Sequence, residues 1–181
     1  MYKGSLVNIR HQSINDMGKL AEFMCSPRYI ETHSYDDPRF AFKEGLEKKF
    51  KERMEKHDHN ELHMVIETIE GKLIGIIGIH GNFWKNGLTW IYSYISDDEF
   101  LQGGYYEEAL ALLLEFLFVE GNARKVIINI QSNDSHGIEA CKTNGFTTEV
   151  VFKEEVLCHG KYIDTYNMAI FKDEYMKTYK K

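Results

Sequence analysis

The spacing of hydrophobic residues changes along the chain in an order that few folds can satisfy. Between residues 42 and 54 an apolar side chain recurs at every fourth position, as on one face of a helix. From Leu62 this spacing gives way to short runs rich in valine and isoleucine, which are typical of strands. A continuous apolar run at Lys125–Gln131 indicates a central strand that is buried on both faces. Helical and strand patterns alternate, so the sequence predicts a mixed α/β (α+β) domain.

The individual elements follow from the same patterns. Strands are predicted over residues 6–10, 62–68, 72–80, 88–96, 125–131, 149–157 and 162–171. Helices are predicted over residues 16–24, from Pro38 to about residue 57, over 105–120 and over 135–144. No linker, repeat or low-complexity tract separates these elements, so we expect one domain over residues 1–181.

Composition limits the partners of the chain. The net charge of −6 argues against a general binder of nucleic acid or of an anionic membrane surface. Residues 91–123 contain seven acidic side chains and neither lysine nor arginine. No apolar run reaches about 18 residues, so no membrane span is expected. The three cysteines are far apart in the sequence, which favours a cytoplasmic protein with reduced thiols over a disulfide framework or a thiolate zinc site.

Two adjacent glycines, Gly103 and Gly104, stand between a predicted strand and a predicted helix. Glycine lets the backbone approach an anion closely, and the start of a helix presents unpaired N–H groups and the positive end of the helix dipole. Such a loop can hold a diphosphate without lysine or arginine. An ordinary strand–helix turn contains the same residue types, so this loop alone leaves both interpretations open.

Three stretches, taken in order, resemble the GNAT superfamily of acyl-CoA-dependent N-acetyltransferases. Residues 101–109, LQGGYYEEA, resemble the pyrophosphate loop of that family, and Asn144-Gly145-Phe146 closes a short helix after a buried strand. Residues 159–164, HGKYID, together with Met168 and the DEY at 173–175, resemble the branch that acetylates ribosomal-protein N-termini and polyamines. The resemblance implies a mixed, mostly antiparallel central sheet of about seven strands flanked by helices. It also implies acetyl-CoA as co-substrate and direct attack of a primary amine on the thioester, and it allows a homodimer.

The same resemblance assigns residues to the cofactor side of the site. The strands at 92–96 and 125–131 would splay apart and admit the pantetheine arm between them. The implied cofactor-binding residues are Tyr94, Ile95 and Ser96 for the pantetheine arm, Gln102, Gly103, Gly104, Tyr105, Tyr106 and Glu107 for the diphosphate, and Asn133 and Asp134 after the buried strand. Cys141 stands where many members have a tyrosine that protonates the leaving thiolate, and it is the predicted proton donor. Ile91 stands where many members have a glutamate, so the resemblance supplies no general base.

Acidic and aromatic residues are the candidates for binding the amine, because an ammonium is attracted by carboxylates and by aromatic faces. They are Glu31, Tyr35, Asp36, His80 and Trp84. The acids of residues 91–123 would also favour a cationic acceptor, which is either a small molecule such as a polyamine or a peptide N-terminus. The alternative is a non-catalytic CoA-binding or interaction module of the same fold.

Four residues with metal-binding side chains lie close together in the sequence: His57, Asp58, His59 and His63. They fall at a predicted helix end and in the loop before a strand, where exposed polar residues are expected without any ligand. No metal site is therefore predicted.

Overall fold

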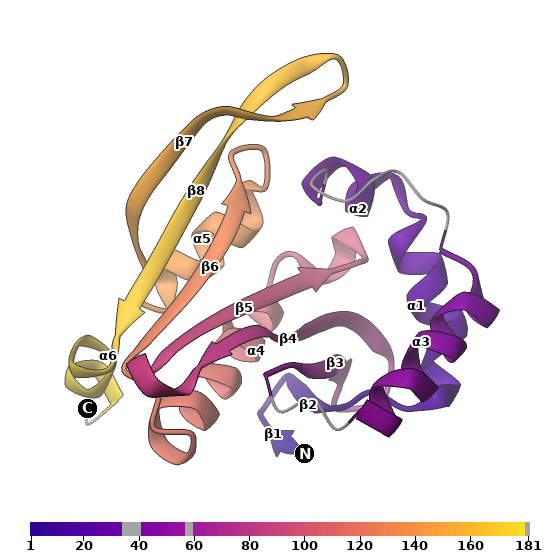
Figure 1. Cartoon of the computed structure of the whole chain (residues 1–181), viewed down its shortest axis with the longest axis horizontal. Coiled ribbons are helices and arrows are strands. Elements are labelled where there is room, and N and C mark those ends of the chain that lie inside the picture. The colour runs from indigo at the N-terminus through magenta and orange to yellow at the C-terminus, as the bar shows by residue number, and fades with distance from the viewer. Residues whose placement is uncertain (34–40, 57–59, 180–181) are drawn as a thin grey trace.

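The computed structural model describes residues 1–33, 41–56 and 60–179. Within these ranges eight strands form one sheet in the order β1-β2-β3-β4-β5-β6-β8-β7 (Figure 1). The strands are β1 Tyr2–Lys3, β2 Val7–His11, β3 Leu62–Thr68, β4 Leu73–Phe83, β5 Leu88–Ile95, β6 Lys125–Gln131, β7 Thr147–Cys158 and β8 Lys161–Phe171. Neighbouring strands are antiparallel except for the parallel pair β5–β6. The predicted fold class is confirmed, and the additional strand is the two-residue β1, which is too short to show a hydrophobic pattern.

Helices cover both faces of the sheet. The helices are α1 Met17–Met24, α2 Pro27–Thr32, α3 Lys43–Lys56, α4 Tyr105–Glu115, α5 Ser135–Thr143 and α6 Lys172–Tyr179. Residues of α1 and α2 pack on Val65 and Tyr94, together with Leu46 and Phe50 of α3. Helices α4 and α5 pack on the opposite face in a larger cluster. The two clusters use alternate side chains of the same strands, as expected of a sheet that is buried on both faces.

Several helices differ from the predicted elements, and α6 was not predicted. Residues 105–120 do not form one α-helix, because the last turn, Phe116–Glu120, is a π-helix. Helix α2 is short, but its start was readable in the sequence: Ser26 Oγ accepts a hydrogen bond from the Tyr29 N–H, and Pro27 occupies the first turn. Helix α3 buries no residue fully, and Phe42 and Met54 at the ends of its predicted apolar face are exposed.

The sheet opens between its two central strands. Strands β5 and β6 pair only from Leu88↔Lys125 to Ile91↔Ile128. Beyond this point they separate, and Figure 1 shows β6 running with β8 and β7 while β5 stays with β4 and β3. The expected splay of these strands is therefore present, and it leaves a V-shaped gap in the hydrogen-bonded sheet.

Several acids of residues 91–123 accept hydrogen bonds from the N-terminal and C-terminal segments of the chain. Glu108 accepts hydrogen bonds from the backbone N–H groups of Leu6 and Val7 at 2.7 and 2.8 Å, and two more from Ser5. Glu120 and Glu115 accept from Tyr2 and Tyr179. None of the helices in the described ranges is both long and apolar enough to cross a membrane.

Candidate active site

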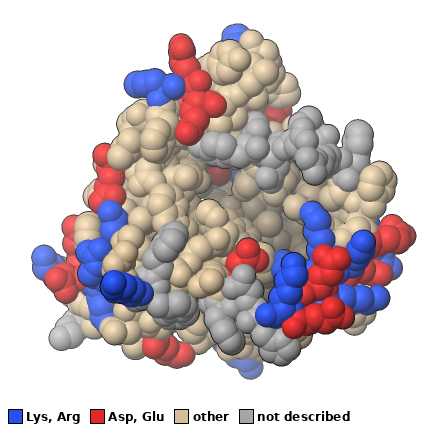
Figure 2. All heavy atoms as spheres, viewed as in Figure 1, with Lys and Arg blue, Asp and Glu red and all other residues tan. Residues whose placement is uncertain are grey.

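A cavity of about 720 Å³ begins at the gap between β5 and β6 and extends under α1, α2 and α3. A volume of this size suits a small-molecule ligand. Figure 2 shows the hollow on this face, with acidic and basic side chains gathered beside it over α3. The α3 residues that line the cavity are Leu46, Lys49, Glu52, Arg53 and Lys56.

One wall of the cavity contains a line of three hydrogen-bonded polar side chains. His63 on β3, Gly78 on β4 and Tyr92 on β5 lie side by side in register. Because Gly78 has no side chain, the Tyr92 hydroxyl reaches across β4 to His63 Nδ1 at 2.8 Å. Glu61 lies on the other side of the ring, with its Oε2 at 3.0 Å from His63 Nε2. All three polar residues line the cavity.

Burial of His63 favours its neutral form. Burial lowers the pKa of His63 below its usual value, and the positive charge of Arg53 lowers it further, although Glu61 acts in the opposite direction. Burial also raises the pKa of Tyr92, so this hydroxyl stays protonated at neutral pH. At neutral pH the cavity wall therefore presents an uncharged imidazole bonded to an uncharged phenol.

The opposite wall contains a buried amide without a partner. Gln131, at the end of β6, is 1% exposed and lines the cavity. Among the described residues neither its Oε1 nor its Nε2 has a hydrogen-bond partner. A buried polar group without a partner costs about 1–3 kcal/mol, so an amide at this position indicates a ligand that bonds to it.

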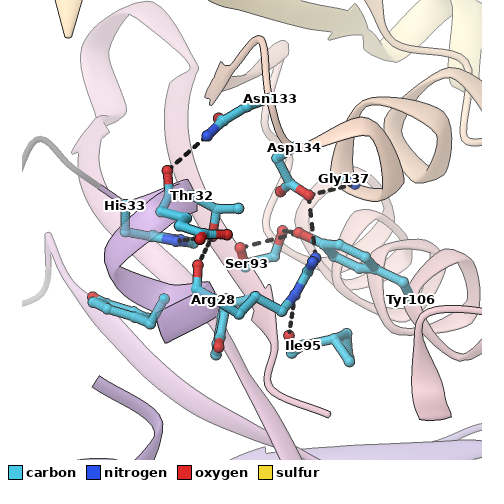
Figure 3. A network of polar contacts seen from close by, with 12 residues as sticks. Arg28, Thr32, His33, Ser93, Ile95, Tyr106, Asn133, Asp134 and Gly137 are labelled. Atoms are coloured by element: carbon cyan, nitrogen blue, oxygen red, sulfur yellow. Dashed lines mark hydrogen bonds and ion pairs between the residues drawn. The ribbon is translucent and has the colours of Figure 1, made fainter. Parts of the chain in front are cut away.

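Helix α2 lies across the mouth of the gap and contacts both of its sides (Figure 3). Arg28 Nε donates to the carbonyl oxygen of Ile95 at 3.2 Å, and Arg28 Nη2 lies 3.2 Å from Asp134 Oδ1. Asp134 also caps α5 by accepting from the Gly137 N–H at 3.1 Å. The Asn133 amide donates to the Glu31 carbonyl oxygen at 2.9 Å. Both residues predicted after the buried strand therefore hold α2 in place.

His33 follows α2 and packs inside the same cavity. Its ring stacks on Tyr29 with centroids 4.5 Å apart and meets the Tyr94 ring edge-on at 5.1 Å. Its Nδ1 lies 3.0 Å from Thr32 Oγ1. Burial lowers the pKa of His33 to about 4, and the charge of Arg28 adds to this effect. The ring is therefore neutral at pH 7.

The predicted diphosphate loop has the backbone that the motif requires. Gly103 and Gly104 have φ angles of 84° and 88°, which only glycine adopts readily. Gly104 is the N-cap of α4 and provides no side-chain cap, so the first N–H groups of the helix are left for another partner. Tyr106 points away from the loop, and its hydroxyl donates to the Ser93 carbonyl oxygen at 3.0 Å inside the gap. The loop fits an anion that is held by backbone groups.

The structure brings only some of the predicted residues together. Asp134, Tyr106 and His80 line the cavity. Tyr94 and Ile95 are the last residues of β5, and Ser96 comes directly after it, so all three lie along the gap. Cys141 is fully buried in the core and does not line the cavity. Glu31 is exposed and faces the β7–β8 hairpin, with its Oε1 at 3.1 Å from His159 Nε2. Tyr35 and Asp36 lie outside the described residues, as does the side chain of Trp84.

One sequence interpretation needs correction. None of the seven acids of residues 91–123 lines the cavity, so they do not form the binding surface for a cationic acceptor; the lining acids are Glu52, Glu61 and Asp134. His63 was a candidate only for a metal site, and no metal site was predicted; the structure places its ring in the cavity wall beside Tyr92. The described residues contain no group of three or more His, Cys, Asp or Glu side chains that could hold a metal ion, while His57, Asp58 and His59 lie outside them. The places of Glu61, Tyr92 and Gln131 in the cavity wall depend on strand register, and no local sequence pattern indicates them.

Comparisons with known proteins agree with this geometry. The model of the GNAT acetyltransferase domain family matches residues 7–147. No curated protein matches the chain. The spermidine N-acetyltransferase of Vibrio cholerae, solved in complex with CoA and spermine, superposes with a TM-score of 0.85 at 18% identity, over 96% of this chain and 99% of that one. A dodecameric structure of that enzyme in an intermediate state gives 0.81 at 18% identity, over 97% and 99%. A structure in complex with manganese ions gives 0.79 at 18% identity, over 96% and 97%.

At this identity the structural matches show the fold alone, whereas the family model spans more than half of the chain. The gap between β5 and β6, the glycine loop that opens α4 and the family match agree with one another. The chain belongs to the GNAT acetyltransferase family and is an N-acetyltransferase with acetyl-CoA as its co-substrate.

Proposed function

We propose that the protein acetylates a primary amine of a small cationic molecule of the polyamine class, by direct attack of the amine on the thioester. The observation that carries this proposal is the cavity of about 720 Å³, which connects the gap between β5 and β6 to an opening beside α3. The aromatic rings of Tyr29 and Tyr92 and the carboxylates of Glu52 and Glu61 line it. These groups suit an ammonium, and a neighbour of the same fold is a spermidine N-acetyltransferase in complex with spermine.

The chain's own residues fit acetyl-CoA, which supplies the acetyl group as a thioester. We assign the diphosphate to the backbone of residues 102–107, because Gly103 and Gly104 give close access to the start of α4. We assign the pantetheine arm to Tyr94, Ile95 and Ser96, where β5 has separated from β6. Arg28 bonds the carbonyl oxygen of Ile95, so this contact must yield where the arm pairs with that oxygen. Cys141 as donor of a proton to the leaving thiolate stays a prediction.

The lining of the cavity carries both acidic and basic side chains. Lys49, Arg53 and Lys56 stand beside Glu52 and Glu61, so the opening is not uniformly acidic. A peptide N-terminus is therefore the second candidate for the acceptor, because its single ammonium needs fewer carboxylates than a polyamine. Positioning an amine against a thioester supplies much of the rate enhancement in a direct transfer.

The experiment is an acceptor panel. Release of free CoA from acetyl-CoA is followed with a thiol reagent in the presence of spermidine, spermine, an aminoglycoside or a short peptide with a free N-terminus. We expect the highest kcat/KM for a polyamine. If no amine stimulates CoA release but calorimetry shows acetyl-CoA binding, the chain is a CoA-binding module. If acetyl-CoA does not bind at millimolar concentration, the cofactor assignment fails as well.

A glycine variant tests the diphosphate loop. Gly104→Val puts a branched side chain at φ 88°, and we expect it to weaken acetyl-CoA binding at least tenfold because the loop can no longer approach the anion. Gly71→Val is the matched control, since Gly71 has a φ of 86° in the β3–β4 turn and nothing within 4 Å of its position. Equal acetyl-CoA affinity in the two variants would place the diphosphate elsewhere.

We also propose that the protein is oligomeric in solution. A neighbour of the same fold is dodecameric, and the resemblance allows a homodimer. We expect the protein to act in the cytoplasm, where acetyl-CoA is available.

A further inference from the structure

The proposed reaction needs a base, and the family position for a glutamate holds Ile91. An amine attacks a thioester only after its ammonium has lost a proton, and at neutral pH a primary amine is almost fully protonated. The line Glu61–His63–Tyr92 lies on the wall of the cavity that would receive the amine. We propose that these three residues form a proton relay in which Tyr92 contacts the acceptor and His63, oriented by Glu61, receives the proton. This inference rests on the proposed function.

The hydrogen bonds fix the direction of the relay. An ionised carboxylate only accepts hydrogen bonds, so the contact of 3.0 Å between Glu61 and His63 requires the proton on Nε2. His63 Nδ1 is then an acceptor, and the Tyr92 hydroxyl donates to it at 2.8 Å. The remaining lone pairs of the Tyr92 oxygen are left to accept from an ammonium in the cavity. This is the arrangement in which a carboxylate orients an imidazole that serves a hydroxyl.

The proton balance closes within the chain. One N–H bond of the ammonium breaks and its proton passes to Tyr92 Oη, while the hydroxyl proton of Tyr92 passes to His63 Nδ1. The phenol ends neutral, and the charge moves from the amine to the imidazole, where Glu61 stabilises it. The neutral amine keeps the electron pair that forms the new C–N bond. The C–S bond of the thioester breaks with its electron pair on the CoA sulfur, and the second proton of the attacking nitrogen ends on that thiolate. Because burial raises the pKa of Tyr92, the residue transfers a proton without persisting as a phenolate.

The groups that face His63 are compatible with this role. Arg53 of α3 lowers the pKa of His63, and Glu61, which directly precedes β3, raises it. Lys49, Glu52 and Lys56 of α3 line the same cavity, and His80 on β4 meets the edge of the Tyr92 ring at 6.3 Å. The other described acids and imidazoles of the cavity have different partners: Asp134 bonds Arg28 and Gly137, Glu52 lies 4.0 Å from Lys48, and His33 bonds Thr32. His80 is the remaining rival, and the experiment includes it.

The relay is tested by pH profiles of kcat/KM with acetyl-CoA and spermidine, or with the best acceptor of the panel. The variants are Tyr92→Phe, His63→Asn, Glu61→Gln and His80→Asn. Tyr179→Phe and His11→Asn are matched controls, because both residues are exposed and lie outside the cavity. Melting temperature and acetyl-CoA affinity, measured for each variant, separate loss of chemistry from loss of fold.

We expect Tyr92→Phe and His63→Asn to lower kcat/KM about 10²-fold at pH 7 with unchanged acetyl-CoA affinity. Wild-type activity should fall as the pH drops through the pKa of His63, below 6.5, because the base must be neutral. In His63→Asn this inflection should vanish, and the defect should shrink towards pH 10, where the free amine needs no base. Glu61→Gln should keep the inflection but shift it to lower pH.

Three results would overturn the relay. One is a Tyr92→Phe variant with the wild-type rate and profile on an amine that the wild type acetylates. Another is an inflection that survives in His63→Asn but is lost in His80→Asn. The third is a defect that is equally large at pH 7 and pH 10. A wild-type protein that acetylates no amine would instead refute the proposed function, so the two failures are distinguishable.

Discussion

The side chain of Cys141 is fully buried beneath α4, at the position where the family resemblance places a proton donor. Burial raises the pKa of its thiol, and the negative charge of Asp134 raises it further. A thiol with a raised pKa is a weaker acid and so a poorer donor to a thiolate. The contacts support a packing role, and the catalytic role stays a prediction that needs its own measurement.

The variant Cys141→Ala separates these two roles. We expect the free energy of unfolding in urea to fall by about 1 kcal/mol, because the substitution leaves a small void in a fully buried site. Values of kcat and KM on the best acceptor then decide the proton-donor assignment. A tenfold loss of kcat at constant KM would support it, and an unchanged kcat would reject it. Cys25→Ala is the control, since Cys25 is only partly buried.

The two sides of the active site differed in how far the sequence could predict them. Gly103 and Gly104 were identified because a positive φ at the start of a helix leaves a local trace in the residue type. The contact between His63 and Tyr92 leaves no local trace in the sequence, because it depends on the register of three strands and on the absence of a side chain at Gly78. Gln131 was missed for a related reason: it ends an apolar strand, and only the separation of β5 from β6 removes its partners.

At the scale of elements, α2 joins the two halves of the divided sheet. Arg28 of α2 donates a hydrogen bond to the carbonyl oxygen of Ile95 on the β5 side. The same side chain forms an ion pair with Asp134 on the β6 side. Helix α2 also places His33 between Tyr29 and Tyr94 over the gap. The sequence predicted an irregular segment here, because the six residues Pro27–Thr32 are too few to show a helical period. The longer elements were predictable, since their hydrophobic spacing repeats several times.

The burial of His33 makes the stability of this element depend on pH. The folded pKa of about 4 lies below the usual value of 6.5, so between these values the unfolded chain binds more protons than the folded one. Stability should therefore fall as the pH drops from 6.5 to 4, by an amount on the order of a few kcal/mol for this residue. His33→Phe keeps a ring against Tyr29 and removes the titration.

Urea unfolding at pH 7, 5.5 and 4 measures this effect. We expect His33→Phe to lose less stability over that range than the wild type. His63 and His80 also have lowered pKa values and titrate in both proteins, so part of the wild-type slope remains in the variant. Parallel curves for the two proteins would show that His33 is not neutral in the folded state.

At the scale of the whole molecule, the active site exists only where two differently built halves meet. The half from β1 to β5 holds the line of Glu61, His63 and Tyr92, and the half of β6, β8 and β7 holds Gln131. The parallel pair β5–β6 connects them over four residue pairs. The overall architecture was predictable because it follows from element order. The cavity was not, because its walls come from strands that are distant in the sequence: Gln131 is 39 positions from Tyr92 and 68 positions from His63.

The outer edge of the second half carries the surface that most favours self-association. Strand β7 ends the sheet, so one side of its backbone has no strand partner within the described chain. Apolar side chains that are 40–65% exposed gather on this hairpin: Val150, Val151, Phe152, Leu157 and Tyr162. An unpaired edge beside exposed apolar side chains is a common basis for contact with another copy of a chain.

We therefore expect light scattering at micromolar concentration to give the mass of a dimer or a larger assembly, and the double variant Val151→Glu, Phe152→Glu to give a smaller one. Each glutamate would place a charge in an interface that excludes water, which is costly without a partner. Ile69→Glu is the control, because Ile69 is at least as exposed as Val151 and Phe152 but lies at the β3–β4 turn. A monomeric wild type would refute the oligomer, and an unchanged mass in the double variant would move the interface away from β7. Since the cavity lies within one chain, the dissociated variant should keep its acetyl-CoA affinity, which separates loss of assembly from loss of fold.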